Sequence, residues 1–132
     1  MEHIFNENEK KELWDEYYAI SDKVRELEAR QSEIGHLMRQ NACNTVASRF
    51  IPLELHDKIR INRKIFVWGG YQYETMEGFF GLFRHEGHIY SGDDGVSSVK
   101  LRLYRIKKDG KPSERYDEFY AGSIVSIEKV ES

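Results

Sequence analysis

Residues 13–38 read LWDEYYAISDKVRELEARQSEIGHLM, and apolar side chains recur in this stretch at alternating intervals of four and three. Seven of the eight positions in the series are apolar, and charged residues surround them. The series consists of Leu13, Tyr17, Ile20, Val24, Leu27, Gln31, Ile34 and Met38. This spacing places the side chains on one narrow stripe of an α-helix, as in a coiled coil. We call the stripe the seam, and we expect it to pack against another helix.

The limits of this helix follow from the residues at its two ends. Asn6 is a suitable N-cap, and Glu9 follows three residues later, as in a capping box. Gly35 weakens the helix by about 1 kcal/mol relative to alanine. Asn41, Asn44 and Ser48 are weak helix formers, so we expect the helix to end between residues 40 and 48, and Pro52 prevents its continuation through the connector.

The seam favours self-association over an intramolecular role. At helical rise, residues 7–41 span about 50 Å, which is longer than a small barrel is wide. The alternative is that the helix lies across the open end of the following barrel and closes it. In heptad notation the seam residues alternate between d and a positions, beginning with Leu13 at d and Tyr17 at a. Gln31 is the one polar residue of the seam, at an a position, and would set the register of a dimer. Lys23 and Glu28 occupy g and e positions and can pair across a parallel dimer, but one such pair does not settle the orientation.

After residue 57 the apolar pattern changes to a period of two. Lys58–Ile61 alternates basic and apolar residues, and Gly69–Gly70 and Asp109–Gly110 mark tight turns. We expect six or seven short strands, with separate strands before and after residue 77 and a return strand at 88–90. Antiparallel pairing and closure into a barrel would remove exposed edges.

In size, turn spacing and its short final apolar strand, the region 55–131 resembles an SH3-like or Sm-like barrel. The resemblance implies a fold and no functional residue. The predicted fold class is therefore α+β, with a long N-terminal coiled-coil-like helix before a small antiparallel barrel. The predicted divisions are an oligomerisation arm at 1–48, a connector at 49–56 and the barrel at 57–132.

Composition narrows the location and the class of partner. The net charge is −3, and residues 51–132 carry thirteen basic and thirteen acidic residues. Non-specific nucleic-acid binding by bulk charge is therefore not expected. The single cysteine, Cys43, excludes an intrachain disulfide, and no apolar run resembles a signal peptide or a membrane span. We expect a cytoplasmic protein that does not bind membranes.

No sequence motif indicates catalysis, and we predict neither enzymatic activity nor a cofactor. His85 and His88 flank Gly87 and are weak candidates for metal ligands, but a solvated hairpin tip accounts for them better. Phosphate-binding glycine patterns are absent from the sequence, and no serine lies in a nucleophile elbow.

Basic and aromatic residues are interleaved in the β region. A barrel of this size is too small to bury eleven large rings, so several of those in this region are expected to reach the surface beside cations. Such rings bind a protein partner or stack on bases. The alternative is that half the rings are core and that the cations pair with acidic residues across strands. The candidate contact residues are Arg60, Trp68, Tyr71, Lys100, Arg102 and Tyr104.

These features together predict a non-enzymatic adaptor. It would form a homo-oligomer, most simply a dimer, through the helix and present its barrels to a protein partner. The first alternative is binding of nucleic acid or a nucleotide by the basic and aromatic face. In size and style the chain is similar to accessory proteins of phages and mobile elements, some of which inhibit host defence. A second alternative is metal-dependent activity at His85 and His88.

Overall fold

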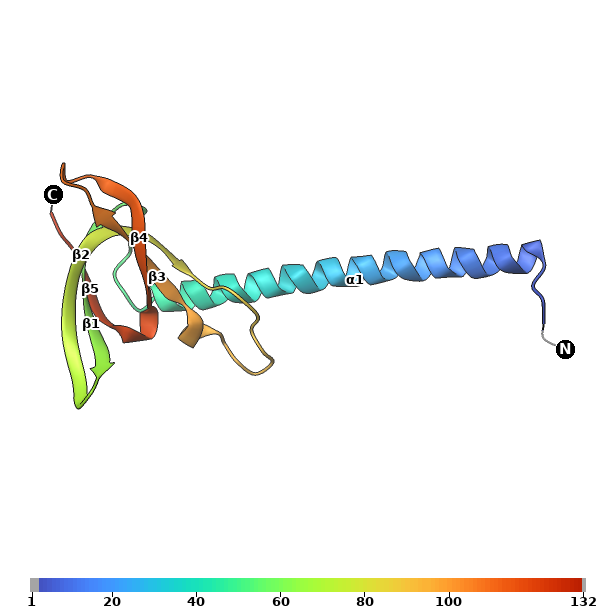
Figure 1. Ribbon diagram of the computed structural model, residues 1–132, viewed down its shortest axis with the longest axis horizontal. Helices are drawn as coiled ribbons and strands as arrows, with labels where there is room; N and C mark the ends of the chain where they lie inside the picture. Colours follow the sequence, from blue (N-terminus) through green and yellow to red (C-terminus); the bar gives the residue numbers. More distant parts are fainter. Residues whose placement is uncertain (1–2, 132) are drawn as a thin grey trace. The chain divides into compact units, whose positions relative to one another are not determined.

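The computed structural model describes residues 3–131 and confirms an α+β protein (Figure 1). One helix, α1 (Glu7–Ala47), precedes an antiparallel sheet of five strands. Single-turn 3₁₀ helices, η1 (Val96–Ser98) and η2 (Ala121–Ser123), precede β3 and β5. The strands are β1 (Lys58–Val67), β2 (Gly70–Arg84), β3 (Lys100–Ile106), β4 (Pro112–Tyr120) and β5 (Ile124–Lys129).

Helix α1 begins with the capping box that the sequence predicts. The Glu9 backbone N–H donates to Asn6 Oδ1 at 2.9 Å, and the Asn6 N–H donates to Glu9 Oε1 at 3.2 Å. These reciprocal bonds satisfy two of the backbone donors that every helix start leaves free. The end at Ala47 falls within the predicted interval. At 41 residues the helix is about 60 Å long.

The sheet has the strand order β4-β3-β2-β1-β5. Its first half pairs β1 with the N-terminal part of β2, and its second half pairs the remainder of β2 with β3. Strand β2 is curved (Figure 1), and at Gly78, close to where the two halves meet, a Cβ atom would lie 2.6 Å from both Leu103 Cγ and the Tyr104 carbonyl oxygen. Only glycine fits so close an approach of two strands.

The strand count and one hairpin differ from the expectation. The two strands expected on either side of residue 77 are one continuous strand, β2, and residues 88–90 form no strand. The β1–β2 loop consists of Trp68 and Gly69, because Val67 pairs with Gly70. A shift of one residue would turn the core residues of β1 outward, so the buried face fixes this register.

Closure into a barrel is not confirmed. Within residues 3–131 the sheet ends at β4 on one side and β5 on the other, and these two strands are not paired with each other. The expected SH3-like or Sm-like barrel is thus supported only as far as a small antiparallel sheet that follows a helix.

The core lies in two adjoining clusters. One joins β1, β3 and β5 through residues such as Ile59, Leu101 and Ile127. The other brings the last turns of α1, at Ala42 and Val46, against Val99 and Ala121. Phe50 and Phe83 stack at 5.8 Å between ring centroids and contact both clusters.

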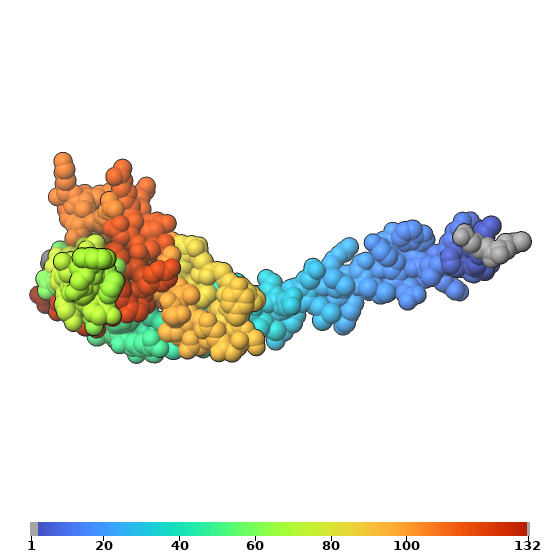
Figure 2. Space-filling view, turned by 60° about the horizontal axis from the view of Figure 1, so that its bottom comes forward, coloured from blue at the N-terminus to red at the C-terminus, as the bar shows by residue number. Residues whose placement is uncertain are grey.

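The connection from β2 to β3 is a long loop, and it covers the C-terminal turns of α1. Arg39 Nη1 donates to the Gly87 carbonyl at 3.4 Å, and Ile89 and Val96 contact the cluster around Val46. Figure 2 shows this loop, in yellow to orange, beside those turns. The expected hairpin tip at Glu86–Gly87 is therefore wrong, because this loop is anchored on α1 and no return strand follows it.

By internal contacts, the chain divides into two compact units between His36 and Leu37. The second unit contains the last turns of α1 together with the whole sheet. Among the described residues, no helix combines the length and apolar character needed to cross a membrane.

Candidate interaction site

The seam of α1 is exposed along its whole length in the single chain. All eight of its residues are solvent-exposed, with exposed fractions of 56% at Ile20 and 58% at Leu27. Apolar side chains at this spacing on a soluble helix normally face a core or a partner helix. The seam is thus a strip of uncovered surface that is apolar at every position except Gln31, and uncovered apolar surface of this kind marks an interaction site.

Near the start of α1, the seam residue Tyr17 packs against two rings that lie beside the seam, Trp14 and Tyr18. Trp14 stacks on Tyr18 with 5.9 Å between ring centroids, and Tyr17 meets both rings edge-on. All three remain exposed. Lys10, Leu13, Trp14 and Tyr17 line a shallow, largely apolar hollow of about 310 Å³ at this end of the seam.

The other faces of α1 carry charged side chains that satisfy one another within the helix. The pairs Lys23–Glu26, Arg25–Asp22 and Arg30–Glu33 are three residues apart, with N–O distances of 3.5, 3.6 and 2.9 Å. Such exposed pairs contribute little free energy. Between residues 22 and 33 they keep the helix surface beside the seam polar.

The predicted contact residue Arg60 is occupied by acidic neighbours. Its guanidinium lies 2.7 Å from Glu77 Oε1 on β2 and 3.3 Å from Glu128 Oε1 on β5. The hydrogen bond with Glu77, followed by that with Glu128, raises the pKa of Arg60 above its ordinary value. Arg60 therefore ties three strands together instead of offering a free positive charge.

Lys100, Arg102 and Tyr104 do share the outward face of β3, as the alternation predicted. The Arg102 guanidinium lies 4.0 Å from the centroid of the Tyr116 ring and 3.5 Å from Glu118 Oε2, and Lys100 Nζ lies 5.0 Å from the Tyr120 ring. The Tyr104 ring meets Tyr116 edge-on at 5.8 Å. This face is a packed set of cation–ring contacts, in which Arg102 is largely buried.

Trp68 and Tyr71 lie apart from that face, at the β1–β2 hairpin. Trp68 is fully exposed and Tyr71 is 62% exposed. Phe66 faces Tyr71 across the strands with 5.6 Å between ring centroids, and Tyr73 lies two residues further on the same side. We call Phe66, Trp68, Tyr71 and Tyr73 the aromatic tip.

Sequence reasoning selected two residues of the aromatic tip and missed Phe66 and Tyr73. The signal that would have found them is the alternation of side chains between the two faces of the sheet, counted outward from the hairpin loop. Residues opposite each other across an antiparallel pair share a face, so Phe66 must accompany Tyr71 once the loop is fixed at Trp68 and Gly69. Lys64 Nζ lies 4.2 Å from the Tyr71 ring, at the edge of the tip.

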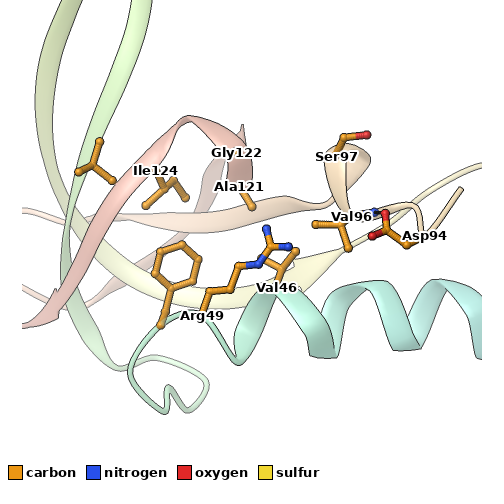
Figure 3. Close-up of a pocket in the computed structure, with 10 residues that line it drawn as sticks. Val46, Arg49, Asp94, Val96, Ser97, Ala121, Gly122 and Ile124 are labelled. Carbon is orange, nitrogen blue, oxygen red and sulfur yellow. Dashed lines mark hydrogen bonds between the residues drawn. The ribbon is translucent and has the colours of Figure 1, made fainter.

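A separate cavity of about 570 Å³ lies between the end of α1 and the loops that precede β3 and β5 (Figure 3). Its polar groups are Arg49, Asp94 and Ser97, among apolar neighbours that include Val46 and Ile124. Asp94 Oδ1 accepts the Val96 N–H at 3.0 Å and so stabilises its own turn. Ser97 has no histidine or lysine beside it in this lining, so the cavity offers no paired nucleophile and base.

The two candidate metal ligands lie on the loop after β2. His85 is half-buried and its Nδ1 has no hydrogen-bond partner among the described residues, whereas His88 is exposed and packs edge-on against Tyr90 at 5.0 Å. Within residues 3–131, no three His, Cys, Asp or Glu side chains come together as a metal site. The arrangement therefore provides no ligand set that includes either histidine.

In comparison with known proteins, no protein-family model and no curated protein matches this chain. The function is therefore inferred from the exposed surfaces of the protein. Two of them are exposed and apolar, the seam of α1 and the aromatic tip of the β1–β2 hairpin.

Proposed function

We propose that this chain is a non-enzymatic adaptor that self-associates through α1 and presents its sheet to a protein partner. The observation that carries the proposal is the exposed seam, which runs from Leu13 to Met38. The proposal includes a cytoplasmic location, which is supported by the single cysteine of the sequence.

Helix physics supports the self-association. Long helices gain most of their stability from packing an apolar face, because intrinsic helix propensity is weak. Within residues 7–36, however, α1 has an exposed apolar seam and no buried residue. A second copy offers a seam of identical spacing, which is the requirement for coiled-coil packing.

The aromatic tip supports binding of a protein partner by the sheet. Tryptophan and tyrosine are enriched at the residues that dominate binding energy in protein interfaces, and their rings contribute large apolar contact areas. The four rings of the tip are between 62% and 102% exposed. Two copies joined by α1 would offer two tips, and binding through both would raise the overall affinity by avidity.

A barrel-like curvature of the sheet is part of the same proposal. The Arg63 guanidinium, on β1, lies 4.0 Å from the Phe119 ring centroid on β4, and it lies 3.4 Å from Ser123 Oγ in η2. Strands β1 and β4 are not neighbours in the sheet. A contact between them across the inner face supports a sheet that curls toward the SH3-like or Sm-like arrangement.

Nucleic-acid or nucleotide binding, as in a phage accessory protein that inhibits host defence, is the second candidate. Lys64 above Tyr71 is the observation in its favour, since cations beside exposed rings suit stacked bases. Against it, five arginines of the sheet have carboxylate partners, which lowers the positive potential that phosphates require. They are Arg60, Arg63, Arg84, Arg102 and Arg105.

The test compares three proteins as affinity baits: the natural chain, a Trp68→Ala/Tyr71→Ala variant and a Leu27→Ala variant. Light scattering first measures each mass against the 15.6 kDa of one chain. We expect the natural chain and the tip variant to be oligomeric. The tip variant should nevertheless fail to capture the protein partner, because it lacks the two rings that contact it. A monomeric natural chain would refute the proposal, and a salt-sensitive gel shift with DNA or RNA would favour the second candidate.

A further inference from the structure

We propose that two copies of α1 associate in parallel and in register, so that each seam residue meets its own counterpart. This inference rests on the self-association proposed above and adds the orientation. It is carried by the charges beside the seam and by the one polar residue within it.

The charges flanking the seam distinguish the two orientations. In a parallel pair, a g residue lies beside the e residue five positions later in the second helix. Lys23 then lies beside Glu28 of the second copy, and symmetry repeats this attraction on the other side. Lys23 Nζ has only a 3.5 Å contact with Glu26 within its own helix, and both side chains are about 70% exposed, so Lys23 remains accessible to a second copy.

The antiparallel pair that overlaps the same eight seam residues reverses the sign of this interaction. Residues at g then face g positions of the second helix, which brings Lys23 beside Arg30 of the second copy, twice by symmetry. Arg30 lies 2.9 Å from Glu33 but keeps 60% of its side chain exposed. Two cations would therefore approach each other at each site.

Gln31 favours the same orientation. In the parallel pair the two Gln31 side chains meet in one layer, where each amide has both a donor and an acceptor for the other. In the antiparallel overlap Gln31 faces Ile20 of the second copy, which leaves a polar amide covered without a partner. A polar residue at one a position is a known determinant of register in coiled coils.

The parallel orientation has a consequence for the proposed function. It brings the C-terminal ends of both helices to one end of the pair. The two sheets, which follow those ends in sequence, are then available to the same target, as avidity requires. The antiparallel pair would separate the two helix ends by most of the helix length, about 60 Å.

The first test measures the dimer dissociation constant of Lys23→Glu in the full chain by sedimentation. A parallel pair places the introduced carboxylate beside Glu28 twice, so we expect association to weaken by roughly five- to thirtyfold. Lys23→Glu combined with Glu28→Lys restores opposite charges and should recover most of the loss. An antiparallel pair would instead bind more tightly after Lys23→Glu, because the introduced carboxylate would then face Arg30, and that result would overturn the inference.

The second test uses disulfide formation in a Cys43→Ala background. Leu13→Cys alone should form a covalent dimer under mild oxidation, and so should Met38→Cys alone. A cross-link that forms only when the two variants are mixed identifies the antiparallel pair and overturns the orientation while leaving self-association intact. A natural chain that is monomeric in sedimentation overturns both the orientation and the proposed function. A dimer that forms no cross-link in either arrangement also overturns the in-register pairing.

Discussion

In the proposed dimer, replacing Leu27 by alanine would remove one seam contact and preserve α1 itself, since alanine has the highest helix propensity. Full burial of a leucine side chain contributes about 1.5–3 kcal/mol. In the single chain 58% of Leu27 is exposed, so covering that part contributes roughly 0.9–1.7 kcal/mol per copy.

Because Leu27 occurs once in each copy, a dimer loses this contribution twice. The total is roughly 2–3.5 kcal/mol, which corresponds to a dissociation constant about 30- to 300-fold higher. The figure is an upper estimate, because alanine still buries its own methyl group. Sedimentation over a range of concentrations measures the change directly.

Tyr18→Ala is the matched control for this substitution. Tyr18 is 60% exposed, close to the 58% of Leu27, but it lies one position outside the seam on the same helix. If exposed apolar area alone drove association, the two substitutions would weaken it comparably. We expect a clear loss with Leu27→Ala and a small effect with Tyr18→Ala, and equal effects would refute coiled-coil packing of the seam.

Three further predictions concern the second compact unit, residues 37–132, which contains the sheet and the end of α1. Gly78→Ala should lower the free energy of unfolding by about 1–3 kcal/mol, because a Cβ atom there would overlap Leu103 and the Tyr104 carbonyl. The loss is measured as a lower urea midpoint. Gly122→Ala is the control and should change the midpoint little, because a Cβ atom at Gly122 has no neighbour within 4 Å. The pKa of Asp57 is lowered mainly by the hydrogen bond from the Glu54 N–H and further by Lys129, and Arg105 lowers the pKa of Asp117. Both carboxylates thus stabilise the fold above their unfolded pKa, about 4, and this stability is lost as the pH falls through their folded pKa values. In urea titrations at a series of pH values, Asp57→Asn should reduce the loss of stability at acid pH. An unchanged loss would contradict the role assigned to Asp57. Burial raises the pKa of the Cys43 thiol, so its alkylation at pH 8 should be slower than that of a free cysteine and should reach the free rate only in denaturant.

The sequence determined the helix more completely than the sheet. The seam spacing and the Asn6–Glu9 capping box depend on residues within a few positions of one another, so local rules sufficed to predict both the helix and its N-cap. The alternation at Lys58–Ile61 likewise predicted which side chains of β1 are buried.

Only the tertiary structure decided how the strands join and which cations are free. Strand β2 continues through residue 77 and packs closely against β3 at Gly78, a contact between residues about 25 positions apart. The partners of Arg60 are 17 and 68 positions away in sequence. Pairing at such separations depends on the register of the whole sheet, which no local pattern specifies. Phe66 and Tyr73 lie within a few positions of Trp68 and Tyr71, and here the deciding fact was which two residues form the hairpin loop.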